Sequence, residues 1–242
     1  MELTRRQVLA FRARAQQLGR ATGSLDDTAV LDLGVQDTGT DGASWALALR
    51  GLPDPPAEQV VLLWTLRGAP HVYRRADLPG IAAATAPFSD ADAAKRMFDA
   101  ARPLTAAGIP ALAGLDTVAA RMREIVDRPT VKGELSTRLT AVLERPYLRD
   151  CVPCGAVHAY EQPFRLAALR AGLELEPGTS PPVLRPIAGF VPAGSTPERR
   201  QAARPTADCT GAKRKIPSRS RRSSRRTHPE QNAQAPSNTT RA

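Results

Sequence analysis

Apolar residues near the start of the chain recur at the spacing of an α-helix. Residues 8–18 place their apolar side chains on one helical face, and Thr4 and Gln7 have the spacing of a capping box. We expect this helix to end near Gly19, because glycine commonly follows the last helical residue. The same spacing predicts two shorter helices, at residues 26–33 and 45–50.

The pattern changes from helix to strand after the proline-rich loop at residues 53–56. Residues 60–66 are rich in apolar and β-branched side chains, residues 67–70 have the composition of a turn, and residues 71–75 match a returning strand. Helices followed by one hairpin are the element order of a winged helix, in which the hairpin is the wing. A further helix is predicted from Ser89 to about Ala101.

The second half repeats this order in outline, with helices first and strands later. Helices at residues 115–126 and 135–143 are joined by a short turn, which makes them a helix-turn-helix candidate. The predicted fold class is α+β, mainly α, with tandem winged-helix domains at residues 1–104 and 105–190. The remaining predicted elements are a strand at residues 156–160, a helix at 164–170 and a strand at 173–175.

The hydrophobic pattern stops after Val191, and Ile216 is the one large apolar residue from there to the last residue. Such a segment cannot bury enough surface to offset its chain entropy, so we expect residues 191–242 to be a disordered basic tail. Residues 199–242 contain 12 Lys and Arg against 2 Asp and Glu, which accounts for the whole net charge of +10. The other 22 basic and 22 acidic residues balance, so the net charge does not identify a partner for the rest of the chain.

Composition argues against several classes of protein. No apolar run approaches the ~18 residues of a membrane span, and the N-terminal segment is amphipathic rather than signal-like. Three cysteines are an odd number, which argues against a disulfide-stabilised fold. We therefore expect a bacterial, cytoplasmic protein with no membrane partner.

Residues 64–71, Trp-Thr-Leu-Arg-Gly-Ala-Pro-His, are the most informative stretch of the chain. They resemble the Arg-Gly-Thr-x-His hairpin of the bacterial winged-helix DNA glycosylases of the AlkZ and YcaQ group, with Arg67 and His71 at the matching positions. Residues 33–38, Leu-Gly-Val-Gln-Asp-Thr, occupy the place of that family's catalytic Gln-x-Gln or Gln-x-Asp motif. The resemblance covers about residues 1–190, and it implies release of bulky alkylated or crosslinked bases from DNA.

The resemblance also implies a fold of three tandem winged helices that form a channel for duplex DNA. Two winged helices fit within residues 1–190, and the third would follow where the chain has its aperiodic tail. We therefore expect that the chain is C-terminally truncated, or that its reading frame is shifted from about Arg199.

Gln36, Asp37 and Thr38 are the candidate catalytic residues. In the family, the first Gln and the Gln or Asp two residues later position a water for attack on the sugar or stabilise the developing positive charge. Gln36 matches the first position, but Thr38 stands at the second and cannot carry negative charge, while Asp37 places a carboxylate one residue early. The alternative is that these residues only end a helix, because Asp and Thr are ordinary capping and turn residues.

Four residues of the hairpin are candidates for contact with DNA: Arg67, His71, Arg74 and Arg75. Arginine side chains on a wing could bind phosphate, and His71 could contact phosphate or a flipped nucleotide. The alternatives are a solvated charged hairpin and, for His71, a strand residue that bonds to a backbone partner.

Cys151, Cys154 and His158 have the spacing of part of a metal site. Two thiolates separated by two residues can bind one Zn²⁺, with the histidine as a third ligand, but a closed structural site needs four ligands. A redox pair and simple buried thiols are the alternatives. We expect no metal and no small-molecule cofactor.

Three functions are compatible with the sequence. One is a monofunctional DNA glycosylase, which would extract a damaged nucleotide from duplex DNA in the nucleoid and cleave the base–sugar bond without a metal. Another is a winged-helix DNA-binding module or transcription regulator without catalysis, which the Thr38 departure favours. The third is a truncated product that has lost both activities.

Overall fold

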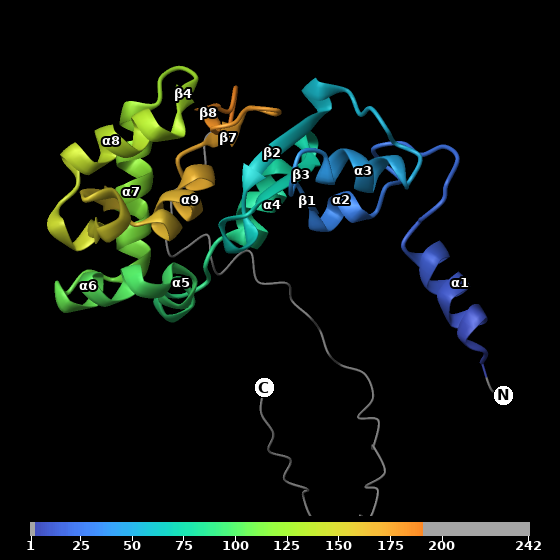
Figure 1. Ribbon diagram of the computed structural model, residues 1–242, viewed down its shortest axis with the longest axis horizontal. Helices are drawn as coiled ribbons and strands as arrows, with labels where there is room; N and C mark the ends of the chain where they lie inside the picture. Colours follow the sequence, from blue (N-terminus) through green and yellow to red (C-terminus); the bar gives the residue numbers. More distant parts are fainter. Residues whose placement is uncertain (1–2, 191–242) are drawn as a thin grey trace, which may run out of the picture. The chain divides into compact units, whose positions relative to one another are not determined.

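The computed structural model describes residues 3–190, which belong to one compact unit and combine α-helices with β-strands (Figure 1). About half of these residues are helical. The α-helices are α1 (Arg5–Ala15), α2 (Val30–Leu33), α3 (Gly42–Ala48), α4 (Leu78–Thr85), α5 (Asp90–Met97), α6 (Ala101–Ala106), α7 (Ala111–Ile125), α8 (Lys132–Val142) and α9 (Glu161–Arg170). The strands are β1 (Val35–Gln36), β2 (Val60–Trp64), β3 (Pro70–Arg74), β4 (Thr130–Val131), β5 (Leu148–Cys151), β6 (Ala156–Ala159), β7 (Leu173–Leu175) and β8 (Val183–Pro186).

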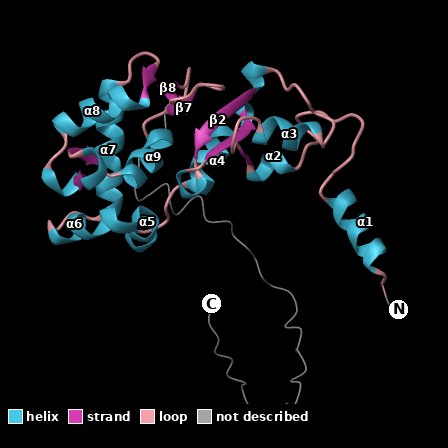
Figure 2. Cartoon of the chain, viewed as in Figure 1, coloured by secondary structure: helices cyan, strands magenta, loops and turns pink. Residues whose placement is uncertain are grey.

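Six strands form one antiparallel sheet in the order β1-β3-β2-β7-β8-β4, and β5 and β6 form a separate hairpin. Figure 2 draws the strands in magenta among the helices and labels β2, β7 and β8. Each half of the sheet has the same internal order, in which the third strand in sequence lies between the first and the second. The halves meet where β2 pairs with β7, with Leu62 opposite Leu175. The predicted boundary at residue 104 stays a prediction, and the sheet contains strands from both sides of it.

The hydrophobic core has a large cluster on one face of the sheet and smaller clusters elsewhere. In α7, Leu115, Val118 and Met122 recur at helical spacing and are almost fully buried against α8 and α9. On the other face of β2 and β3, Val61 and Tyr73 pack in a second cluster with residues of α4. The alternation of side chains along β2 therefore supplies both clusters from one strand.

Helix α1 forms as predicted, but it does not pack against the core. Its capping box between Thr4 and Gln7 is confirmed, and the helix ends at Ala15, because Gln16 is the C-cap and Gln17 has a φ of 58°. No residue of α1 is buried, and Phe11 is 65% exposed, although the apolar face predicted a core contact. A capping box is made within one turn of helix, so it forms without a partner surface.

Other elements confirm or correct the sequence prediction. The hairpin of β2 and β3 and helices α7, α8 and α9 lie where the pattern placed them. The helix predicted from Ser89 begins there but breaks at Phe98, which has a φ of 51°. Helix α4 and the short strands β1, β4 and β8 were not predicted. The predicted tail, residues 191–242, lies outside the described residues.

No single helix within residues 3–190 is long and apolar enough to cross a membrane, while one pair of helices bent by 100°, Asp90–Ala106 with Ala111–Ile125, meets the length and composition criteria together.

Glu174 on β7 connects the two halves of the sheet electrostatically. Its side chain is 6% exposed, and its carboxylate lies 2.8 Å from Arg75 Nη2 and 2.9 Å from Arg185 Nε. Arg75 follows β3 in the first half, whereas Arg185 is on β8 in the second. A buried carboxylate between two guanidinium groups satisfies charges that would otherwise be costly at this position.

We predict that Glu174→Gln lowers the free energy of unfolding by about 2–3 kcal/mol, because it leaves two arginines without their shared anion. The loss is no larger because both arginines are partly solvated. Urea denaturation measures the change. The matched control is Glu144→Gln at an exposed position, for which we expect a change within about 0.5 kcal/mol. Equal losses in the two variants would contradict the bridging role of Glu174.

Candidate nucleic-acid interface

Gln36 and His71 lie directly opposite each other on neighbouring antiparallel strands. β1 pairs with β3 in a register that places Val35 opposite Val72 and Gln36 opposite His71. Residues opposite each other in an antiparallel pair point to the same face of the sheet, so the two side chains share one face. Gln36 is exposed, while His71 is 6% exposed. The pairing thus brings the candidate catalytic residue next to a candidate DNA contact.

Hydrogen bonds fix the position of the His71 ring. Nδ1 lies 2.9 Å from the carbonyl oxygen of Ala69 and 3.1 Å from Thr65 Oγ1. A carbonyl can only accept, so the bond to Ala69 requires a proton on Nδ1. Nε2 makes no hydrogen bond with any residue in the described part of the chain. The expected alternative, a bond from His71 to a backbone partner, is therefore confirmed for Nδ1, and contact with DNA stays a prediction for Nε2.

Tyr73, which is buried, is the third side chain in the hydrogen-bond network of His71 and Thr65. Its hydroxyl lies 2.8 Å from Thr65 Oγ1, and the ring centroids of Tyr73 and His71 are 6.2 Å apart. Burial raises the pKa of Tyr73, and the hydrogen bond with Thr65 opposes that shift. Thr65 and Tyr73 could not be recognised as supporting residues from the sequence, because their side chains meet that of His71 only once the hairpin has formed.

Gly34 permits the close approach of β1 to β3. Its φ is 83°, and a Cβ atom at this position would lie 2.3 Å from Cζ of Tyr73. Any other residue would be strained by the positive φ and would collide with a ring that is itself held by Thr65. Glycine immediately before β1 is therefore a geometric requirement for placing Gln36 opposite His71.

Asp37 connects the end of β1 to β3 and to α3 through two hydrogen bonds. Its backbone N–H donates to the Pro70 carbonyl at 2.9 Å, and its Oδ1 accepts from the N–H of Ala43 at 3.1 Å. The alternative that these residues end a helix is therefore wrong, because Gln36 lies in β1 and α2 ends at Leu33; Asp37 instead accepts from an N–H in the first turn of α3, whose N-cap residue is Asp41. Thr38 is exposed.

The turn between β2 and β3 presents Arg67 to solvent and rests against α9. Arg67 is exposed and has a φ of 56°, in the left-handed region that few arginines adopt. Beneath it, Gly68 is buried, and its carbonyl accepts from Arg165 Nη1 at 3.2 Å. The guanidinium of Arg165 also lies 5.3 Å from the ring centroid of Trp64. The turn is therefore anchored, while the Arg67 side chain makes no bond to the residues that the structure describes.

Glu161 on α9 supports this anchor. Its carboxylate bonds to Arg165 and lies 3.1 Å from Lys132 Nζ. Burial would raise the pKa of Glu161, but the hydrogen bonds from Arg165 and Lys132 outweigh it and lower the pKa. Because the carboxylate stays ionised, it holds Arg165 in place beside Trp64.

Arg74 and Arg75 point into the protein. Arg74 lies 2.6 Å from Asp32 and 3.2 Å from Asp77, donates to the Thr28 carbonyl, and has a side chain that is 12% exposed. Arg75 donates to two backbone carbonyls and to Glu174. The prediction that they contact phosphate stays untested, and these bonds favour a structural role.

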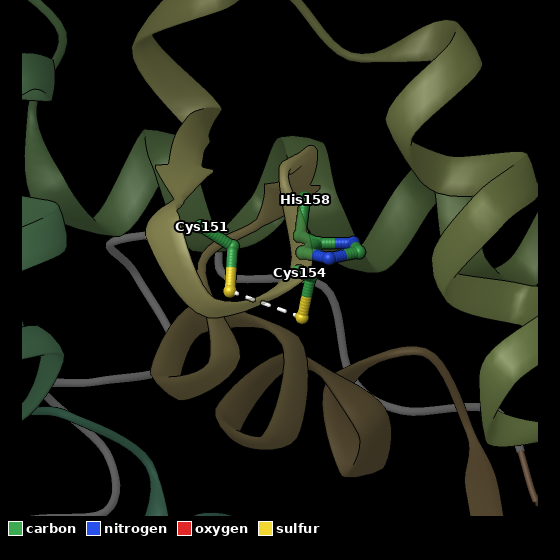
Figure 3. Close-up of side chains that lie close together, drawn as sticks. All are labelled: Cys151, Cys154 and His158. Atoms are coloured by element: carbon green, nitrogen blue, oxygen red, sulfur yellow. Dashed lines mark hydrogen bonds between the residues drawn. The ribbon is translucent and has the colours of Figure 1, made fainter.

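Cys151, Cys154 and His158 come together on the hairpin of β5 and β6 (Figure 3). The two sulfur atoms are 3.2 Å apart. Cys154 is exposed and Cys151 is partly exposed, so the alternative of simple buried thiols is wrong. Both residues lie at the exposed turn of the hairpin. The hydrogen bond between the two thiols and one with the Cys154 backbone lower the pKa of Cys151, and the thiol–thiol bond raises the pKa of Cys154.

We predict that Gly34→Ala lowers the free energy of unfolding by about 2–4 kcal/mol, because it adds overpacking against Tyr73 to the strain of a positive φ. The matched control is Gly39→Ala, whose φ of 70° imposes similar strain but whose Cβ would meet nothing within 4 Å. We expect that control to cost about 1 kcal/mol. Thermal and urea unfolding measure both variants, and a Gly34→Ala variant no less stable than the control would show that the ring contact is unimportant.

Comparison with known proteins identifies the family of the chain. Residues 30–212 match the family described as DNA glycosylase AlkZ-like. No curated protein matches the chain. Among solved structures, the DNA glycosylase AlkZ of Streptomyces sahachiroi is similar, with 22% sequence identity and a TM-score of 0.49. The alignment covers 76% of this chain and 49% of AlkZ, so this chain spans about half the length of AlkZ. Because the family match extends over more than half of the sequence, the chain belongs to the AlkZ-like DNA glycosylase family.

Proposed function

We propose that this protein binds duplex DNA and acts as a glycosylase on alkylated or crosslinked bases. The observation that carries the proposal is the placement of Gln36 opposite His71 on one face of the sheet, at the two positions where the family resemblance predicts function. Membership of the AlkZ-like family supports the reaction class.

We also propose that each half of the sheet belongs to a winged helix. The strand order supports this, since β1-β3-β2 and β4-β8-β7 both place the third strand in sequence between the first and the second. The second unit runs α7-β4-α8-α9-β7-β8, so its helices precede its final hairpin, and the hairpin of β5 and β6 is inserted between α8 and α9. On this proposal α9 occupies the position of the recognition helix, and it is the helix against which the turn below Arg67 rests.

In the proposed reaction, Gln36 positions the attacking water. Its carboxamide can accept a hydrogen bond from water and donate one to the sugar, and it lies exposed with no bond to another described side chain. The water adds to the sugar carbon as the base–sugar bond breaks and loses one proton to the solvent. The departing base takes the bonding electrons, which neutralise a cationic alkylated base, while an uncharged base takes up one proton from the solvent in exchange. His71 Nε2 would bond to the extracted nucleotide or its phosphate, and Arg67 would contact the phosphate backbone.

A binding module without catalysis is the second candidate, and one observation favours it. The carboxylate nearest to Gln36 in sequence belongs to Asp37 and accepts a hydrogen bond from Ala43 in α3. Thr38, at the family's second catalytic position, offers only a hydroxyl. If a negative charge is essential for excision, this chain would recognise damaged DNA without cleaving it.

We predict that Gln36→Ala lowers the single-turnover rate of excision from a duplex with one alkylated base by about 100-fold or more, a size typical for loss of a group that positions or activates water. DNA affinity and unfolding free energy should stay unchanged, since Gln36 is exposed. Gln59→Ala, also exposed and outside the site, is the matched control and should leave the rate unchanged. Unaltered excision by Gln36→Ala would remove Gln36 from the mechanism.

A binding measurement distinguishes the glycosylase from the binding module. It compares the affinities of the full chain for two duplexes that differ only by a central abasic-site analogue. The glycosylase proposal predicts tighter binding to the analogue, because the missing base lowers the cost of extracting the nucleotide. Equal affinities would favour the module. Binding to neither duplex would overturn both.

We predict that Arg67→Ala weakens binding to both duplexes by a similar factor and lowers the slope of log affinity against log salt by about 1, as expected when one phosphate contact is lost. Arg121→Ala is the control, since Arg121 is exposed on α7 and pairs with Glu124. A salt slope that does not change with Arg67→Ala would place the DNA elsewhere.

A further inference from the structure

The hairpin of β5 and β6 carries a cluster that the glycosylase proposal does not use. We propose that Cys151, Cys154 and His158 bind one Zn²⁺ ion through their two sulfur atoms and a ring nitrogen. This inference is independent of the proposed function, because it concerns a different hairpin and a different chemistry.

Strand pairing places the three side chains on one face of the hairpin. Cys151 pairs with Ala156 and Arg149 pairs with His158, so Cys151 and His158 occupy diagonal positions on the same face. Cys154 ends the short 3-10 turn Val152–Cys154, which folds its sulfur back to 3.2 Å from that of Cys151. Figure 3 shows both sulfur atoms and the imidazole gathered beside this turn.

The distances suit a single ion. The possible ligand atoms of the three residues all lie within 4.8 Å of one another. Two sulfur atoms bound tetrahedrally to zinc at ~2.3 Å stand roughly 3.8 Å apart, so small side-chain rotations would admit the ion. Two thiolates and a neutral imidazole would balance the charge of Zn²⁺.

The backbone of the turn already has a defined conformation without a metal ion. Gly155 has a φ of 62°, in the left-handed region, which turns the chain sharply after Cys154 into β6. The backbone and thiol of Cys154 both hydrogen-bond to the sulfur of Cys151. The two sulfur atoms therefore already lie side by side at the turn, close to the separation that one shared ion requires.

The exposure of the turn distinguishes a metal site from ordinary core packing. Val152 is 91% exposed, and Cys154 is exposed beside it. The base of the hairpin packs against α8 and the main core, whereas its turn is exposed, so an ion that joins the two strands near the turn would stabilise that end. Within residues 3–190, the cluster contains no fourth His, Cys, Asp or Glu ligand, which leaves one coordination position for water.

The test is a zinc titration of the full chain carrying Cys209→Ser, so that Cys151 and Cys154 are its remaining thiols. The protein is freed of metal with a chelator, kept reduced with a phosphine and titrated with zinc chloride against a chromogenic competitor. We expect one Zn²⁺ per chain, and on replacement by Co²⁺ the intense near-ultraviolet absorption of cobalt–thiolate bonds. Cys151→Ser or Cys154→Ser should abolish that absorption and weaken zinc binding by at least about 100-fold, and His158→Ala by at least about tenfold, because each removes a direct ligand.

Asp150→Asn is the matched control on the same hairpin. Asp150 alternates with the ligand positions along β5 and bonds to Arg145, so its loss should leave zinc affinity unchanged. Circular dichroism of each variant shows whether the fold is retained. Absence of stoichiometric zinc in the reduced protein, zinc retained after Cys151→Ser, or an equal loss with Asp150→Asn would each overturn the proposal. Detection of a Cys151–Cys154 disulfide after oxidation, together with no zinc binding after reduction, would also overturn it and would indicate a redox pair.

Discussion

The pairing of β1 with β3 is the contact on which the candidate site depends. β1 has only two residues, so it exists because β3 supplies its hydrogen-bond partners. Tyr73 packs over Gly34 at the start of this pairing, and Asp37 continues it past the end of β1 by bonding to Pro70. Gln36 lies between these two points, which leaves it little freedom to move along the sheet or away from His71. The geometry of the site is thus a consequence of backbone pairing more than of contacts made by Gln36 itself.

The sequence predicted structure well wherever the signal was local. The capping box of Thr4 and Gln7 and the N-cap at Ser89 act within one helical turn, and both are present. The strands of the β2–β3 hairpin were recognisable because they are rich in β-forming side chains and flank a turn. Strands β1, β4 and β8 are short and owe their existence to partners distant in sequence, so no periodicity could reveal them.

The candidate site was predicted by residue identity but not by arrangement. Gln36, Arg67 and His71 were singled out from their motifs, yet their environments depend on residues elsewhere in the chain. Arg74 illustrates the difference: its partners Thr28 and Asp32 lie 46 and 42 positions away, so a cluster of basic residues on a hairpin looked available for phosphate. The number of arginines available to bind phosphate therefore cannot be counted from the sequence, because an arginine that pairs inside the fold is not available.

We propose, above all, that the face of the sheet bearing Gln36 and His71 receives the damaged nucleotide. The most direct measurement is the structure of the full chain bound to a duplex with an abasic-site analogue. We expect the Gln36 carboxamide and His71 Nε2 to lie within about 2.6–3.2 Å of atoms of the abasic nucleotide or of one intervening water. A complex in which the analogue lies against another surface and touches neither Gln36 nor His71 would contradict the proposed site.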